Sequence, residues 1–159
     1  MTLAHFTERQ LLVPRLRSSD QAGAINELIT RLDKAGSIDD SLAFFQAVMQ
    51  REYVMSTWVL DGVAFPHARG KGARSLCFAV GLSRDGVAWG KDQTAHALFL
   101  LAVPTSGLSI YLELVGVLAR LVRDELEFGR LRQCVQPDDM WRVLEDVPVD
   151  VPSATRANP

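Results

Sequence analysis

Residues 95–103 read AHALFLLAV, and this stretch decides the fold that we expect around it. All of its residues except His96 are apolar, and a run of this length is too short to span a bilayer. Such a run is typical of a central strand that is covered on both faces, and Pro104 ends it. The remaining segments must therefore supply a layer of helices on each side of a sheet.

Other strands are expected before this central one. Residues 75–82 read SLCFAVGL and predict a strong strand, and Asp85-Gly86 then signals a turn before a further short strand at residues 87–89. Three more segments are also expected to be extended: residues 11–13, 57–59 and 63–65.

Helical periodicity precedes this block of strands. Apolar residues recur at helical spacing from Ala22 to Leu32, with N-cap chemistry in Ser18-Ser19-Asp20 and a stop at Gly36. Ser37 or Asp39 is expected to cap a second helix, which ends near Arg51. The inner face of that second helix is expected to hold four apolar residues: Leu42, Phe45, Val48 and Met49.

Three further helices are predicted after the strands. The first covers residues 108–122, Asp124 opens a shorter one, and Asp138-Asp139 caps the last. The order of helices, strands and helices predicts an α+β fold with a mixed sheet between helical layers. We expect one folded domain at residues 1–147 and a flexible tail at residues 148–159, which is rich in Pro, Ser and Ala.

The overall charge balance excludes several classes of partner. The net charge is −2, from 17 basic and 19 acidic residues, which gives no basic footprint for nucleic acid and no helix suited to a membrane surface. The N-terminus lacks the pattern of a secretory signal. Cys77 and Cys134 lie far apart among apolar neighbours, so we expect buried free thiols and a cytoplasmic protein.

Residues 51–67, REYVMSTWVLDGVAFPH, carry the chemistry that stands out. They combine Arg51 at a helix end, the hydroxyl pair Ser56-Thr57, and His67 after a strand. A neutral imidazole is a nucleophile near pH 7, because its ordinary pKa is about 6.5, and a guanidinium gives paired donors to phosphate oxygens. These are parts for holding a phosphoryl group on histidine. Alternatively, Arg51 is an exposed helix-end charge and Ser56-Thr57 a simple turn.

Other kinds of site receive little support. The sequence has no HxxxH, HxH or CxxC spacing for a metal, and no GxSxG, Walker or Rossmann motif. A histidine-based hydrolase would need a paired nucleophile and acid at a recognisable spacing, and none is present. His96, at the start of the central strand, is either a structural histidine or a residue that supports His67 from beside the site.

The pattern resembles the enzyme IIA domain of the fructose–mannitol family of the bacterial phosphoenolpyruvate:sugar phosphotransferase system, which includes nitrogen-regulatory IIA proteins. Arg51-Glu52 with Ser56-Thr57, then GVAFPH at residues 62–67, occur at the spacing of that family. The strand that ends in LLAVP at residues 100–104 and the helix after it also match, so the resemblance covers about residues 8–147.

The resemblance implies a three-layer α/β/α fold and a phosphotransferase role without metal or organic cofactor. His67 would be phosphorylated by the histidine-containing phosphocarrier protein, and Arg51 would stabilise the phosphoryl oxygens. The group would pass to a IIB domain, or serve as a signal to a regulatory target protein. The chain would act as a stand-alone IIA without inserting into the membrane.

Two positions depart from the family pattern. Tyr111 stands where a second histidine usually contacts the active one, and a tyrosine cannot become a cation near neutral pH. Met55 stands where a glycine usually precedes the Ser-Thr pair, and it would be strained if the backbone there needs a positive φ. An alternative function is therefore a regulatory binding module that no longer relays phosphate and acts through protein–protein contacts.

Overall fold

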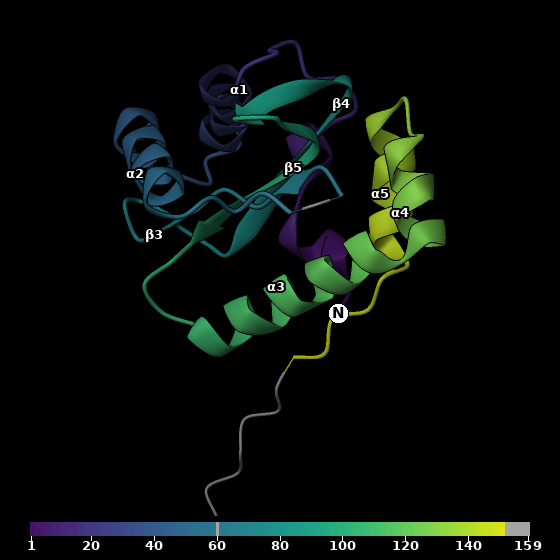
Figure 1. The fold of residues 1–159 in the computed structure, drawn as a ribbon. Coiled ribbons are helices and arrows are strands. Elements are labelled where there is room, and N and C mark those ends of the chain that lie inside the picture. The colour runs from purple at the N-terminus through teal and green to yellow at the C-terminus, as the bar shows by residue number, and fades with distance from the viewer. Residues whose placement is uncertain (60, 152–159) are drawn as a thin grey trace, which may run out of the picture.

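A computed structural model describes residues 1–59 and 61–151 and has an α+β fold built on a five-stranded mixed sheet (Figure 1). β4 and β5 pair antiparallel in its centre, and the other strands pair parallel to one of these two. The strands across the sheet are β1 (Leu12–Val13), β4 (Cys77–Gly90), β5 (Gln93–Val103) and β2 (Val63–Ala64), and β3 (His67–Arg69) also pairs with β5.

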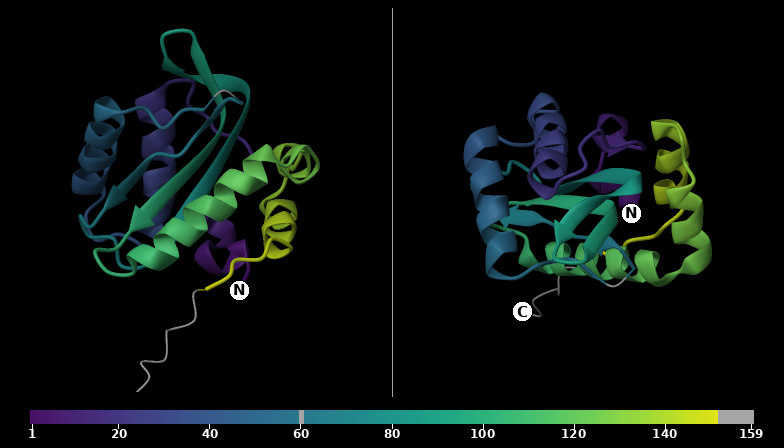
Figure 2. Two further views of the ribbon diagram at one scale, coloured as in Figure 1. Left: turned by 60° about the horizontal axis from the view of Figure 1, so that its bottom comes forward. Right: turned by 45° about the horizontal axis from the view of Figure 1, so that its top comes forward.

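Helices cover both faces of the sheet, which confirms the three-layer arrangement (Figure 2). α1 (Gln21–Lys34) and α2 (Ser41–Val54) pack on one face. α3 (Leu108–Arg123) packs on the other, followed by α4 (Glu125–Arg132) and α5 (Pro137–Glu145).

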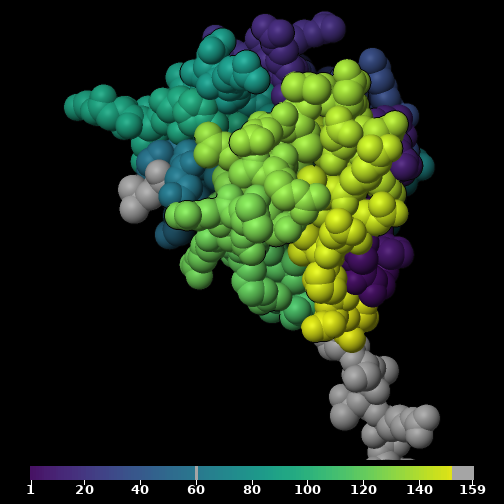
Figure 3. Space-filling view, turned by 90° about the vertical axis from the view of Figure 1, so that its right-hand side faces the viewer, coloured from purple at the N-terminus to yellow at the C-terminus, as the bar shows by residue number. Residues whose placement is uncertain are grey.

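The two ends of the described chain meet beside α5. Two short 3₁₀ helices, η1 (Leu3–Phe6) and η2 (Arg9–Leu11), precede β1. The Val149 amide donates to the Met1 carbonyl at 2.8 Å, and the Val149 side chain is buried. Figure 3 shows the yellow C-terminal segment against the purple N-terminal one. The tail expected at residues 148–159 lies outside the described residues from 152 onward, and the domain boundary at 147 stays a prediction.

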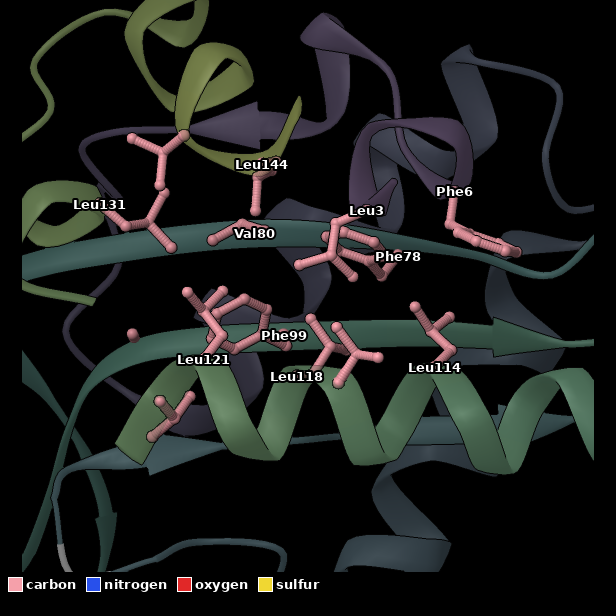
Figure 4. Packing of buried hydrophobic residues seen from close by; sticks show 14 of the residues in the cluster. Leu3, Phe6, Phe78, Val80, Phe99, Leu114, Leu118, Leu121, Leu131 and Leu144 are labelled. Carbon is pink, nitrogen blue, oxygen red and sulfur yellow. The ribbon is translucent and has the colours of Figure 1, made fainter. Parts of the chain in front are cut away.

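The prediction of a covered central strand is confirmed in β5. Phe99 and Leu101 face α3, and Leu98 and Leu100 face α1 and α2, because successive side chains of a strand point to opposite faces. All four are buried. Figure 4 shows Phe99 against leucines of α3, which packs its apolar side along the sheet.

The predicted strand at residues 57–59 is wrong. Only Val59 makes a ladder contact there, an isolated bridge to Val63. The amide and hydroxyl of Thr57 donate to a carboxylate of α2 instead of to a strand. A side-chain acceptor at a helix end has captured donors that a sheet would otherwise use.

The predicted turn at Asp85-Gly86 is also wrong. β4 continues through it with a register shift between Leu82 and Val87, and the hairpin turns at Lys91-Asp92. The Gly86 amide donates to Ser83 Oγ at 3.0 Å, and Gly86 has a φ of 94°. The Asp-Gly pair therefore forms a bulge within the strand, since both motifs use a positive φ.

The helix boundaries agree with prediction in part. Asp20 and Asp124 cap α1 and α4 as expected. The caps predicted for α2 and α5 are wrong: Asp40 caps α2, and α5 begins with Pro137 after Gln136, which places Asp138-Asp139 in the first turn. A proline at the first helical position lacks only an amide that would have no partner there.

The predicted inner face of α2 is wrong at Leu42, which is largely exposed. Val48 is fully buried as predicted, Phe44 is fully buried although it was not predicted, and Phe45 and Met49 are only partly buried. The buried residues of α2 therefore recur every four positions, beginning at Phe44.

Candidate functional site

His67 is the first residue of β3 and lies opposite Leu101 of β5. Its half-buried ring places Nδ1 at 2.9 Å from the Phe65 carbonyl oxygen. A carbonyl oxygen only accepts hydrogen bonds, so this contact requires the proton on Nδ1. The neutral ring then carries its free lone pair on Nε2. The local backbone thus selects which nitrogen can act as a nucleophile.

Glu52 is a buried carboxylate at the last turn of α2. It continues the stripe of Phe44 and Val48 at four-residue intervals and is 5% exposed. A carboxylate in such a position is costly unless donors surround it. Its oxygens accept four hydrogen bonds, from Thr57 N at 2.7 Å, Thr57 Oγ1 at 2.7 Å, Trp89 Nε1 at 2.9 Å and Ser56 Oγ at 3.2 Å.

Thr57 connects Glu52 to the segment that carries His67. Its hydroxyl donates to Glu52 and accepts from the Phe65 amide at 3.1 Å, while the Phe65 carbonyl contacts His67. Both hydrogen-bonding roles of this hydroxyl are engaged within the protein. The Ser56 hydroxyl likewise donates to Glu52. Ser56 and Thr57 therefore act here as positioning groups and do not point free donors at a ligand.

Arg51 lies beside this network at the end of α2. Its Nη1 donates to the Met55 carbonyl at 2.7 Å, which closes the helix. Met55 has a φ of −156°, an extended conformation that any residue adopts. Met55 therefore does not have the positive φ that would have strained its backbone. Its exposed side chain adds apolar surface next to Arg51.

Tyr111, in the first turn of α3, faces His67 with ring centroids 6.3 Å apart. Burial raises the pKa of the Tyr111 hydroxyl above its usual value of about 10, and the nearby charges of Arg51 and Arg69 partly oppose this. Tyr111 is therefore a neutral hydrogen-bond donor at physiological pH.

Arg69 is a site residue that our sequence analysis missed. It follows His67 by two positions in β3, and residues two apart on a strand share a face. Its Nη2 donates to the Thr105 carbonyl at 2.9 Å, which draws the side chain toward the loop before α3. The spacing of two residues between His67 and Arg69 indicates a shared face only in a strand, and the sequence did not predict that residues 67–69 form one.

The structure does not bring His96 to His67. His96 lies five positions before Leu101, the partner of His67, which is about 17 Å along an extended strand. Its Nδ1 contacts the Ser83 carbonyl at 3.0 Å instead. Of the six residues singled out from sequence, five gather around the end of α2 and the start of α3, and His96 belongs to another part of the molecule.

Among residues 1–59 and 61–151, no group of three or more His, Cys, Asp or Glu side chains is arranged to hold a metal ion. In the same part of the chain, no helix has the length and apolarity needed to cross a membrane.

The site is thus an imidazole held at a sheet edge beside Tyr111, which in turn lies near the guanidinium groups of Arg51 and Arg69. The model of the family described as "Phosphoenolpyruvate-dependent sugar phosphotransferase system, EIIA 2" matches residues 5–147, and the chain belongs to this family. This confirms the resemblance drawn from the Arg51 to His67 spacing.

Three known proteins illustrate the relationship. The fructose-specific EIIABC component of Bacillus subtilis is 30% identical over 127 residues, which cover 79% of this chain but only 20% of that relative. The nitrogen regulatory protein IIA-Ntr from Neisseria meningitidis has a TM-score of 0.76 at 20% identity, covering 89% of this chain and 98% of that one. The IIA mannitol enzyme from Escherichia coli, solved in complex with phosphorylated IIB, has a TM-score of 0.70 at 18% identity, covering 86% and 94%.

Replacing Thr57 by valine tests the positioning network. Thr57→Val keeps the shape of the side chain but leaves a Glu52 oxygen and the Phe65 amide without their partner. We expect the free energy of unfolding in urea to fall by about 1–3 kcal/mol. Thr57→Ser should recover most of this loss, because serine supplies the same hydroxyl. An equal loss in both variants would contradict the role assigned to the hydroxyl.

Proposed function

We propose that the chain accepts a phosphoryl group on Nε2 of His67 from the histidine-containing phosphocarrier protein. It then passes the group to a IIB partner or uses it as a regulatory signal. Membership of the EIIA 2 family supports a phosphotransferase component. The observation that carries the finer proposal is the contact between His67 Nδ1 and the Phe65 carbonyl, which leaves Nε2 as the nucleophile.

The transfer step balances without a further reactant. The Nε2 lone pair attacks the phosphorus of the donor phosphohistidine, a new N–P bond forms, and the N–P bond of the donor breaks. Its electron pair returns to the donor imidazole. The Nδ1 proton of His67 stays on the ring, and its hydrogen bond to Phe65 stabilises the positive charge that the ring gains. The same geometry serves onward transfer in reverse.

The charge of the moving group is met by neighbouring donors. Phosphoryl transfer depends mainly on in-line positioning and on neutralisation of the phosphoryl oxygens. Arg51 from α2 and Arg69 from β3 both lie near Tyr111, the neighbour of His67, and supply planar cationic donors. Tyr111 adds a neutral donor from α3. Two guanidinium groups here carry positive charge that a second, protonated histidine would otherwise add.

Exposed apolar side chains near the site suit a protein partner. Tyr53 and Met55 at the end of α2, and Leu108 and Leu112 at the start of α3, are exposed. Apolar side chains beside arginines are typical of the core of a protein interface. The IIA mannitol enzyme that forms a complex with IIB shares this fold, which supports a IIB partner for this chain. The free thiols Cys77 and Cys134 support a cytoplasmic location.

Phosphorylation can be tested directly. The protein is incubated with phosphoenolpyruvate, enzyme I and the histidine-containing phosphocarrier protein, and its mass is measured. We expect a gain of one phosphoryl group in the unmodified protein and none in His67→Ala, with His96→Asn labelled normally as the matched control. No gain under conditions that label a known EIIA would reject the proposal and favour the alternative, a binding module that works by contact alone.

Arg51 is expected to set the rate of this reaction. Arg51→Lys keeps the charge but loses the planar pair of donors, so the phosphorylation rate should fall about tenfold or more. Arg123→Lys, at the far end of α3, provides the control and should react at the normal rate. Circular dichroism should be unchanged in both variants. A normal rate for Arg51→Lys would show that Arg51 does not contact the phosphoryl group.

Tyr111 decides whether the chain relays phosphate or stores it. In Tyr111→His, we expect faster transfer from phosphorylated His67 to a IIB protein, because a histidine can become cationic as the group moves. In Tyr111→Phe, which loses the hydroxyl but keeps the ring, transfer should slow by several-fold. Rapid mixing of the phosphorylated variants with IIB measures both rates. Equal rates in all three proteins would exclude a role for this side chain.

A further inference from the structure

A second polar cleft lies away from His67. It has a volume of about 740 Å³, within the range of small-molecule sites in proteins. Its walls are the β4 bulge with the start of β5, the segment after β1, and the end of α4 with the residues that follow. These are the teal, purple and yellow-green segments that converge near the top of Figure 3.

Three arginines line this cleft, one from each wall. Arg84 comes from the bulge, Arg15 from the segment after β1, and Arg132 from the last turn of α4, while Asp85 is the single carboxylate among the lining residues. The whole chain has a net charge of −2, so this is a local concentration of positive charge.

The three guanidinium groups are not paired with carboxylates in the part of the protein that the structure describes. Within residues 1–59 and 61–151, none of them takes part in a salt bridge, whereas five other arginines do. Arg132 lies over the Phe128 ring at 5.6 Å, an arrangement that supports the planar group on one side. Unpaired guanidinium groups that face a common space repel one another, so an anion between them would stabilise the group.

His96 also lines the cleft, and two glycines lie close to its ring. A Cβ atom at Gly86 would lie 2.2 Å from Thr94 Cγ2 and 3.1 Å from His96 Cε1, and one at Gly62 would lie 3.1 Å from the Thr94 carbonyl oxygen and 3.2 Å from His96 Cδ2. Both glycines have a positive φ, a conformation that other residues rarely adopt. The bulge in β4 and the turn before β2 therefore leave the room that Thr94 and this imidazole occupy.

The hydrogen bond of His96 fixes what its second nitrogen can do. Its Nδ1 must carry a proton to donate to the Ser83 carbonyl at 3.0 Å. In the neutral ring, Nε2 is then an acceptor. A ligand with hydroxyl groups can donate to this nitrogen, while an anion without protons, such as sulfate, cannot.

We propose that this cleft binds a small phosphorylated polyol, such as a sugar phosphate. Arg15, Arg84 and Arg132 hold the phosphate through charge-assisted and bidentate hydrogen bonds. His96 Nε2 accepts a hydrogen bond from a hydroxyl of the polyol. The site is separate from His67 and makes no use of the phosphoryl transfer described above.

Titration of ¹⁵N-labelled protein, followed by amide NMR shifts, tests this proposal. Glucose 6-phosphate should move the amides of residues 83–86, His96 and residues 133–135, and equally so in His67→Ala. Glucose should move none of these amides, and sulfate should bind several-fold more weakly than glucose 6-phosphate. Equal affinity for sulfate and glucose 6-phosphate would overturn the proposal that the ligand is a phosphorylated polyol.

The arginines of this cleft are exposed, so they can be replaced without disturbing the fold. Arg84→Ala with Arg132→Ala removes two of the three cations without touching the core, and we expect the affinity for glucose 6-phosphate to fall about tenfold or more. Arg120→Ala with Arg123→Ala removes two exposed cations of α3 and should leave the affinity unchanged. Equal weakening in both double variants, or shifts confined to the surroundings of His67, would overturn the proposal.

Discussion

The buried carboxylate of Glu52 joins the end of α2 to the following loop and to β4. Its oxygens accept hydrogen bonds from Ser56 and Thr57 of that loop and from Trp89 of β4. A charge removed from water is tolerated only when such donors replace the lost solvent. The Thr57 hydroxyl, which donates to Glu52, also accepts a hydrogen bond from the Phe65 amide. The Phe65 carbonyl that orients His67 is therefore held in place through Thr57 and Glu52.

The sheet provides the second part of this positioning. β5 is buried on both faces and pairs with β2 and β3, so His67 is fixed relative to a buried central strand of the sheet. The same strand leads through Pro104 into α3, and the first turn of that helix brings Tyr111 to the ring of His67. Histidine, tyrosine and both arginines are thus placed by elements that all pack against β5 or next to it.

Much of this arrangement follows from local patterns in the sequence. The apolar run at residues 95–103 was enough to predict a covered central strand, and the spacing from Arg51 to His67 was enough to predict a candidate site. The extended segment at residues 57–59 was mispredicted because Thr57 has strand-like propensity, while the acceptor that captures it is a carboxylate five residues earlier. Pattern rules score residues in isolation and do not anticipate such a partner.

The roles of Glu52 and Arg69 were not predicted for related reasons. A glutamate in a helix is normally exposed, and its burial depends on the phase set by Phe44 and Val48, which the expected inner face with Leu42 got wrong. Arg69 shares a face with His67 only because the chain resumes pairing after Pro66. The Asp85-Gly86 bulge is a similar case, since the same dipeptide suits a turn or a bulge, and tertiary pairing decides between them.

Pro66 also has a consequence for how the molecule behaves in a crowded solution. β2 and β3 form the outer side of the sheet in the described part of the chain, and exposed sheet edges tend to recruit strands from other molecules. Two strands of two and three residues, separated by Phe65 and by Pro66, which has no amide donor, offer no continuous ladder for such recruitment. His67 can therefore lie at an open sheet edge without promoting aggregation. A protein that binds at this edge must recognise side chains, because it cannot pair with a continuous strand.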